Sequence, residues 1–168
     1  SLLDGQVVKV RGRDLATGCS AFSDDSVVFE VLPLPHVSLI SDDFDQTICQ
    51  GDFVTFTASG ATTYEYFIDG NSQGASSTST TFSTNLLQNN GIVSVEGIEN
   101  GCANQNSLQP FIVNPTPNTA MASSDPDTSI CVGTSVNFTA SGATAYQFLV
   151  NGVAQGPISG TNTFATSS

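Results

Sequence analysis

The sequence predicts an all-β protein made of tandem antiparallel β-sandwiches, with about 82 residues per repeat. Residues 48–74 recur without a gap as residues 130–156, and 15 of the 27 paired positions are identical. Short segments with alternating apolar and polar residues lie between Gly, Asn, Asp and Ser, and no amphipathic helical run occurs. A period of this length indicates an array of whole domains, each with its own core.

The repeat predicts three domains. Residues 1–35 correspond to the C-terminal half of one repeat, since Pro33-Leu34-Pro35 recurs as Pro115-Thr116-Pro117. Residues 36–117 correspond to a complete repeat, and residues 118–168 to the N-terminal part of the next. We therefore expect both ends of the chain to cut through domains.

Seven strands are predicted in the complete repeat, which is the count of an immunoglobulin-like antiparallel sandwich. Asp69-Gly70-Asn71 supplies residue types that accept positive φ in a tight hairpin, and Asn151-Gly152 stands at the equivalent place. The predicted strands are 37–40, 52–58, 63–69, 72–76, 79–86, 91–98 and 108–114.

Comparison of the two copies indicates which side chains are buried. Apolar residues are retained at alternate positions, whereas Phe53 becomes Ser135. Because the chain has no tryptophan, Tyr66 and Phe148 are expected to take the central place of the core. The predicted core positions are Val54, Phe56, Ala58, Tyr64, Tyr66, Ile68, Phe111 and Val113, with equivalents Val136, Phe138, Ala140, Tyr146, Phe148, Val150, Phe29 and Val31.

The charge of the chain is sparse and acidic. Fifteen acidic and three basic residues give a net charge of −12. Such a surface repels nucleic acid and anionic lipid, so we expect neither as a partner. A surface of Ser, Thr, Asn and Gly is typical of extracellular β-proteins. No apolar run is long enough for direct membrane insertion.

Four cysteines without a CxxC spacing indicate the disulfides of an exported protein rather than a zinc site. The simplest pairing joins Cys49 to Cys102 within one repeat. In an immunoglobulin-like topology, however, these residues lie at opposite ends of the sandwich, about 20 Å apart, whereas a disulfide needs Cα atoms within about 7 Å. In the alternative, Cys19, Cys49, Cys102 and Cys131 each pair with a cysteine outside this chain. Both schemes stay open.

Few other residues are candidates for a functional site. Asp43 and Asp45 recur as Asp125 and Asp127, and these carboxylates are candidate calcium ligands at a domain junction. Aspartates in loops also form turns, and the sequence favours this role over calcium binding. We therefore expect the chain to require no cofactor. His36 lies in the linker with no partner in a catalytic motif.

Four motifs stand out in the complete repeat: Ile48-Cys49-Gln50-Gly51, Val54-Thr55-Phe56-Thr57-Ala58-Ser59-Gly60, Tyr64-Glu65-Tyr66-Phe67-Ile68-Asp69-Gly70 and Glu99-Asn100-Gly101-Cys102. Together they resemble the motifs of Ig/PKD-like repeats in giant cell-surface proteins of Bacteroidota. Similar repeats occur in SprB-like gliding-motility adhesins, which are substrates of type IX secretion and extend from the outer membrane as filaments. The Asp25-Ser26-Val27 triplet also resembles the O-glycosylation motif of exported Bacteroidota proteins, which makes Ser26 a candidate glycan site.

The resemblance implies a stalk or filament segment of a large secreted adhesin on the cell surface. Such a segment gives mechanical extension for surface attachment or gliding motility. Its expected partners are neighbouring repeats, and further candidates are other copies of the filament and surface polysaccharide. No constellation of catalytic side chains recurs, so an enzyme is not expected.

The alternative function is a carbohydrate-binding or spacer module of a secreted polysaccharide-degrading enzyme. A sugar platform needs exposed aromatic side chains along one face, and Phe53 and Phe67 are the candidates. The second copy has Ser135 and Leu149 at these positions, which weakens this alternative.

Overall fold

The computed structural model describes residues 1–24 and 26–167, and this part of the chain is all-β. The predicted all-β class is confirmed. The described residues contain no helix that could cross a membrane. The strands are β1 (Val7–Val8), β2 (Arg11–Arg13), β3 (Ser20–Phe22), β4 (Val27–Val28), β5 (Ser38–Ser41), β6 (Thr47–Cys49), β7 (Val54–Ser59), β8 (Thr63–Ile68), β9 (Asn71–Ser72), β10 (Thr81–Thr84), β11 (Val93–Glu99), β12 (Cys102–Ser107), β13 (Ile112–Asn114), β14 (Ala120–Ser123), β15 (Ser135–Ser141), β16 (Leu149–Val150), β17 (Val153–Ala154) and β18 (Thr163–Ser167).

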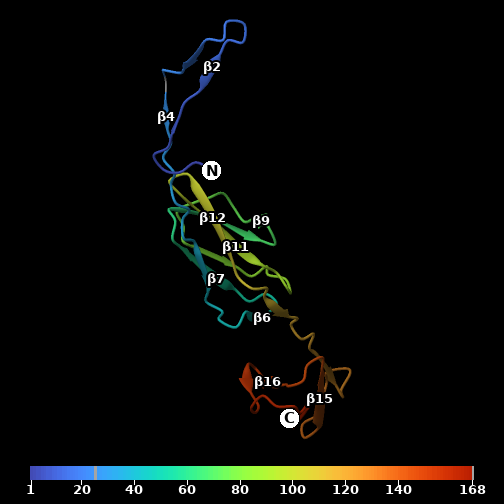
Figure 1. The fold of residues 1–168 in the computed structure, drawn as a ribbon. Coiled ribbons are helices and arrows are strands. Elements are labelled where there is room, and N and C mark those ends of the chain that lie inside the picture. Colours follow the sequence, from blue (N-terminus) through green and yellow to red (C-terminus); the bar gives the residue numbers. More distant parts are fainter. Residues whose placement is uncertain (25, 168) are drawn as a thin grey trace. The chain divides into compact units, whose positions relative to one another are not determined.

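The chain separates into two compact units, Ser1–Asn114 and Pro115–Ser168. The division lies at the start of the Pro115–Pro117 linker. Within the first unit, the complete repeat contains two antiparallel sheets, ordered β10-β7-β5 and β12-β11-β8-β9 (Figure 1). The same repeat also contains a separate short parallel pair, formed by β6 and β13.

One hydrophobic core joins the two sheets of the complete repeat. Its centre is Phe56 from β7, whose ring meets Phe111 edge-on at a centroid distance of 5.7 Å. Both side chains are fully buried. Tyr66, which the sequence places at the centre, is also buried in this core and stacks on Phe82 at 5.3 Å. Its hydroxyl has the polar partner that a buried tyrosine needs, because it donates to the backbone oxygen of Thr80.

The predicted pattern of buried residues holds in the complete repeat. Val54, Phe56 and Ala58 alternate with more exposed neighbours along β7, as expected for a strand with one face on the core. The equivalents of the other core positions in the first partial copy, Phe29 and Val31, are 37% and 48% exposed. The prediction that these two residues are buried is therefore wrong for this partial copy, as it is for Val150 in the second copy, which is 42% exposed.

The sequence prediction missed two strands of the complete repeat, the short β6 and the longer β12. β12 follows β11 through a two-residue turn, with Glu99 opposite Cys102. Asn100 and Gly101 both have positive φ, 50° and 80°, as the tight turn between antiparallel strands requires. β12 was not predicted because its side chains are mostly exposed and polar, so its sequence shows no alternation of apolar and polar residues.

The remaining strands form small antiparallel sheets. In the first partial copy β1 pairs with β4, and β2 with β3. In the unit Pro115–Ser168 the sheets are β14-β15-β18 and β16-β17. β15 repeats the pattern of β7, with Val136 and Ala140 buried.

Candidate functional site: the two ends of the repeat

The linker that enters the complete repeat is held by side chains of β12. Asn104 Nδ2 donates a hydrogen bond of 3.0 Å to the backbone oxygen of Pro35, and Asn106 Nδ2 donates one of 2.9 Å to that of Val37. Pro35 and Val37 are both buried. The linker is therefore part of the folded repeat and not a free tether between domains.

Two glycines make room for this linker. An added Cβ at Gly60 would lie 1.9 Å from the backbone oxygen of His36, and one at Gly97 would lie 2.6 Å from Val37 Cγ2. Gly142 repeats the first contact, since its added Cβ would lie 1.9 Å from the oxygen of Asn118. The same close approach of linker and strand is thus built into both copies. His36, a linker residue in the sequence analysis, contributes its backbone, while the residue is exposed.

A tyrosine fastens the turn beside the linker. The hydroxyl of Tyr64 donates to the oxygen of Ala61 at 2.6 Å and accepts from the amide of the same residue at 2.9 Å. Tyr146 makes the same two bonds with Ala143. Tyr66 instead donates to the oxygen of Thr80 at 2.6 Å. Burial raises the pKa of Tyr66 above its ordinary value.

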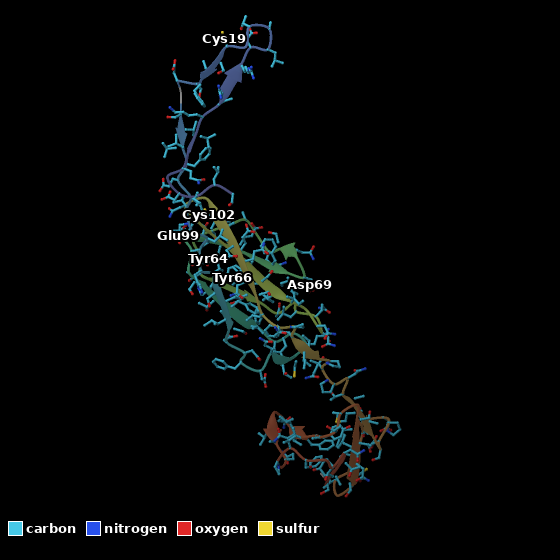
Figure 2. All side chains as sticks on the ribbon, in the orientation of Figure 1. Cys19, Tyr64, Tyr66, Asp69, Glu99 and Cys102 are labelled. Carbon is cyan, nitrogen blue, oxygen red and sulfur yellow. The ribbon has the colours of Figure 1, made fainter. Side chains whose placement is uncertain are left out.

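Cys102 lies at this same end of the repeat (Figure 2). Its Sγ is 4.0 Å from the backbone oxygen of Leu32, a residue of the incoming chain, and its thiol is free. Cys19 takes the equivalent place in the first partial copy, directly before β3. It is exposed, and its backbone oxygen accepts from the amide of Asp14.

Cys49 lies at the opposite end. It ends β6, where it is the register partner of Asn114 in β13. β13 continues from Phe111, whose amide donates to the oxygen of Gly91 just before β11, whereas Cys102 follows the other end of β11. The seven residues of β11 span roughly 20 Å. The structure therefore does not bring Cys49 and Cys102 together.

The four candidate calcium ligands serve as acceptors within their own loops. Asp43 and Asp45 both accept from the amide of Thr47, at 3.3 and 3.0 Å. Asp125 accepts from the amide of Asp127 at 3.1 Å. The amide of Ser129 and the Asp125 side chain lower the pKa of Asp127. Among residues 1–24 and 26–167 no three acidic, His or Cys side chains gather as a metal-binding group. Calcium binding stays a prediction.

The last candidate from the sequence, Ser26, is exposed directly before β4. The preceding residue of its motif, Asp25, lies outside the described residues. Glycosylation of Ser26 stays a prediction.

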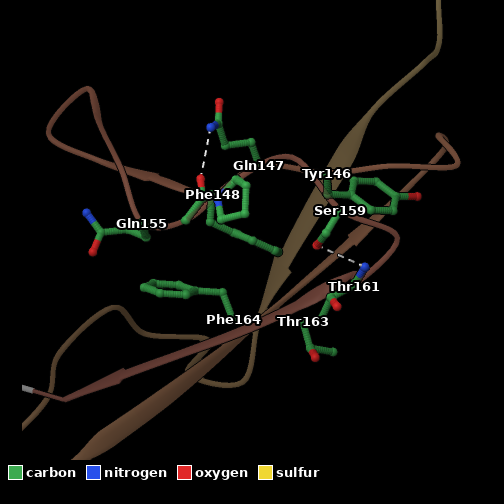
Figure 3. Close-up of a pocket in the computed structure, with 10 residues that line it drawn as sticks. Tyr146, Gln147, Phe148, Gln155, Ser159, Thr161, Thr163 and Phe164 are labelled. Atoms are coloured by element: carbon green, nitrogen blue, oxygen red, sulfur yellow. Dashed lines mark hydrogen bonds between the residues drawn. The ribbon is translucent and has the colours of Figure 1, made fainter.

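A shallow hollow recurs in both copies. In the second copy it has a volume of about 230 Å³ and is lined by the rings of Tyr146, Phe148 and Phe164 with Gln and Ser/Thr side chains (Figure 3). The equivalent hollow beside Tyr64 and Tyr66 measures about 130 Å³. Both are smaller than the roughly 300–1,000 Å³ of typical small-molecule sites.

No family model and no curated protein matches this chain. The recurring features at the two ends of the repeat are thus the best guide to its role. They concern the joining of one repeat to the next, through the linker and the two cysteine positions.

Proposed function

We propose that this chain is a stalk segment of a large secreted cell-surface adhesin, built from tandem immunoglobulin-like repeats. The observation that carries the proposal is the linker held by Asn104 and Asn106 against the complete repeat. A linker with its backbone fixed in this way transmits force and orientation better than a flexible one. The recurrence of the Gly60 contact at Gly142 extends this design to the second copy.

Mechanical extension is the proposed mechanism. In one sheet β7 is hydrogen-bonded to a strand on each side, and in the other sheet β11 and β8 are. Pulling on the ends of a repeat loads many backbone hydrogen bonds and the shared core together. In the proposed array the partners are neighbouring repeats, other filament copies and surface polysaccharide. The expected location is the outer surface of the cell, with attachment through other parts of the protein.

The alternative role, a carbohydrate-binding module of a secreted enzyme, finds less support. Phe53 precedes β7, a strand of one sheet, whereas Phe67 lies in β8 of the other sheet. Aromatic side chains on different sheets do not form one platform. A non-enzymatic stalk with no required cofactor therefore remains the proposal.

Fluorescent antibody labelling of the repeat on living cells tests this function. Label that stays on the surface and travels along the cell is the expected result for a gliding adhesin. Stationary surface label would support a stalk for attachment and contradict the gliding role. Label found in the medium alone would contradict the stalk and favour the secreted-enzyme module. A matched cell line without the protein controls for antibody specificity.

A further inference from the structure

The surroundings of Cys102 identify the part of the preceding repeat that faces it. Its Sγ lies 4.0 Å from the backbone oxygen of Leu32. Leu32 stands 82 positions before Asn114, so the two are equivalent residues in successive copies. Cys102 therefore contacts the last residue of the strand that corresponds to β13 in the preceding repeat.

The complete repeat shows what lies beside that residue. Asn114 is the register partner of Cys49 in the parallel pair β13 and β6. The amide of Gln50 also donates to the oxygen of Asn114, at 2.8 Å. Neighbouring strands in a sheet lie about 4.8 Å apart. A cysteine equivalent to Cys49 in the preceding repeat would thus lie one strand spacing from Leu32, which Cys102 touches.

Side-chain direction agrees with this placement. Ile48 is buried in the core, and the next residue of β6, Cys49, is exposed. Alternation along the strand therefore turns Cys49 away from the core of its own repeat. Cys102 is partly buried against the incoming chain. The two positions lie at opposite ends of one repeat but at the same junction between successive repeats.

We propose that disulfides join successive repeats: Cys102 bonds to the cysteine equivalent to Cys49 in the preceding repeat. Cys49 in turn bonds to the cysteine equivalent to Cys102 in the following repeat. The inference rests on the proposed array, because both partner cysteines belong to portions of the neighbouring repeats that this chain does not include. It selects between the two pairings that the sequence left open. Each junction then has two covalent connections, the linker and the disulfide.

The bond forms by thiol–disulfide exchange with an external disulfide, either a small molecule or a protein oxidant. One cysteine thiolate attacks the donor and gives a mixed disulfide, releasing one donor thiol. The second cysteine thiolate attacks the mixed disulfide and releases the other donor thiol. Two cysteine thiols are oxidised to one disulfide, and the donor disulfide is reduced by two electrons to two thiols, which take up the two protons that the cysteine thiols lose.

The test uses the full chain with one further copy of residues 36–117 inserted after residue 117. This longer chain contains one complete junction between two complete repeats. It is oxidised with glutathione disulfide, alkylated and digested without reduction, and linked peptides are identified by mass spectrometry. The expected bond joins Cys49 of the first copy to Cys102 of the second. Because the two copies have identical sequences, the copy to which each linked cysteine belongs is assigned from the copy-specific variants described next. A bond between Cys49 and Cys102 of the same copy would overturn the proposal, and so would scrambled pairings.

Matched variants separate the proposed bond from a general loss of folding. Cys102→Ser in the second copy should abolish the linked peptide and leave Cys49 of the first copy as a thiol. Cys102→Ser in the first copy is the control and should leave the linked peptide at its original yield. Equal losses in both variants would contradict the proposal. Circular dichroism of each variant shows whether the β-structure is retained.

Failure of this proposal can be distinguished from failure of the stalk function. A same-copy disulfide would end the present inference, whereas travelling or stationary surface label would still support a stalk. Conversely, label in the medium alone would reject the stalk while leaving the mapped disulfide intact. The two experiments share no readout.

Discussion

Gly60 is a residue whose substitution should be costly for two separable reasons. Its φ of 90° lies in the left-handed region, and an added Cβ would meet the backbone oxygen of His36. Positive φ alone costs a non-glycine residue about 1–2 kcal/mol. The clash with backbone should add roughly 1–3 kcal/mol, because the linker must move. We expect Gly60→Ala to lower the free energy of unfolding by the sum, measured by denaturant titration with circular dichroism.

Gly51 provides the matched control for this substitution. Its φ is 92°, nearly that of Gly60, but no atom lies within 4 Å of an added Cβ. Gly51→Ala should therefore show the backbone strain without the clash. Equal destabilisation by the two variants would mean that the contact with the linker contributes nothing.

The two buried tyrosines of β8 should respond differently to loss of the hydroxyl. Tyr64 both donates to and accepts from Ala61, and Tyr146 repeats the arrangement, whereas Phe148 naturally lacks the hydroxyl of Tyr66. We expect Tyr64→Phe to destabilise the repeat by about 1–2 kcal/mol and Tyr66→Phe by about 0.5–1 kcal/mol. Thermal and denaturant unfolding measure both. The reverse order would contradict the importance assigned to the Tyr64 turn.

Tyr66 also predicts a pH dependence. Burial raises its pKa in the folded state above the ordinary value of 10.0, so folding favours the protonated phenol. Its contribution to stability is complete below pH 10.0 and is lost as the pH rises through the folded-state pKa. Between pH 10.0 and the folded-state pKa, the free energy of unfolding of Tyr66→Phe should therefore fall less steeply than that of the unaltered chain. Parallel curves for the two proteins would refute this assignment.

At the scale of elements, β12 is the strand that secures the junction. Its Asn104 and Asn106 bind the linker, while Gln105 between them binds Glu96 Oε2 at 2.8 Å. Alternation places the two asparagines on one face of the strand and the glutamine on the other. Side chains on one face of β12 therefore bind the linker, and a side chain on the other face binds the neighbouring strand β11.

Removal of both asparagines should release the linker without unfolding the sandwich. In Asn104→Ala with Asn106→Ala, we expect faster hydrogen exchange around Val37 and a loss of about 1–3 kcal/mol, since two hydrogen bonds disappear. Gln105→Ala is the control on the same strand and should leave this exchange unchanged. Hydrogen exchange is measured by mass spectrometry. If Gln105→Ala accelerated exchange around Val37 as much as the double variant does, the role assigned to the two asparagines of β12 would be contradicted.

Strands that pack on the core could be predicted from the sequence, whereas exposed or very short strands could not. β7 was predictable because Val54, Phe56 and Ala58 alternate and recur in the second copy. β12 was missed because its residues are polar and mostly exposed. Its formation depends on pairing with β11, and the only local signal was the Asn100-Gly101 turn. β6 is only three residues long and pairs with the distant β13.

At the scale of the whole molecule, the stalk proposal predicts stiffness across junctions. We expect the chain with an inserted repeat to show a radius of gyration that rises linearly with repeat number in small-angle scattering. ¹⁵N relaxation should give one rotational correlation time for successive repeats, since fixed linkers prevent independent motion. A variant with a short Gly-Ser segment after Pro117 is the control and should tumble as separate domains. Independent tumbling of the unaltered repeats would contradict the proposal.

The sequence by itself determined the all-β class, the 82-residue period, the buried face of the apolar strands in the complete repeat and the tight turn at Asp69-Gly70. These properties follow from local alternation, from glycine and asparagine chemistry, and from the comparison of two copies within one chain. Only the tertiary structure decided that Phe56 packs edge-on against Phe111 in the core, that β12 holds the linker, and that Cys49 is the register partner of Asn114. The physical reason is that these features depend on contacts between residues far apart in the chain, which no local pattern records.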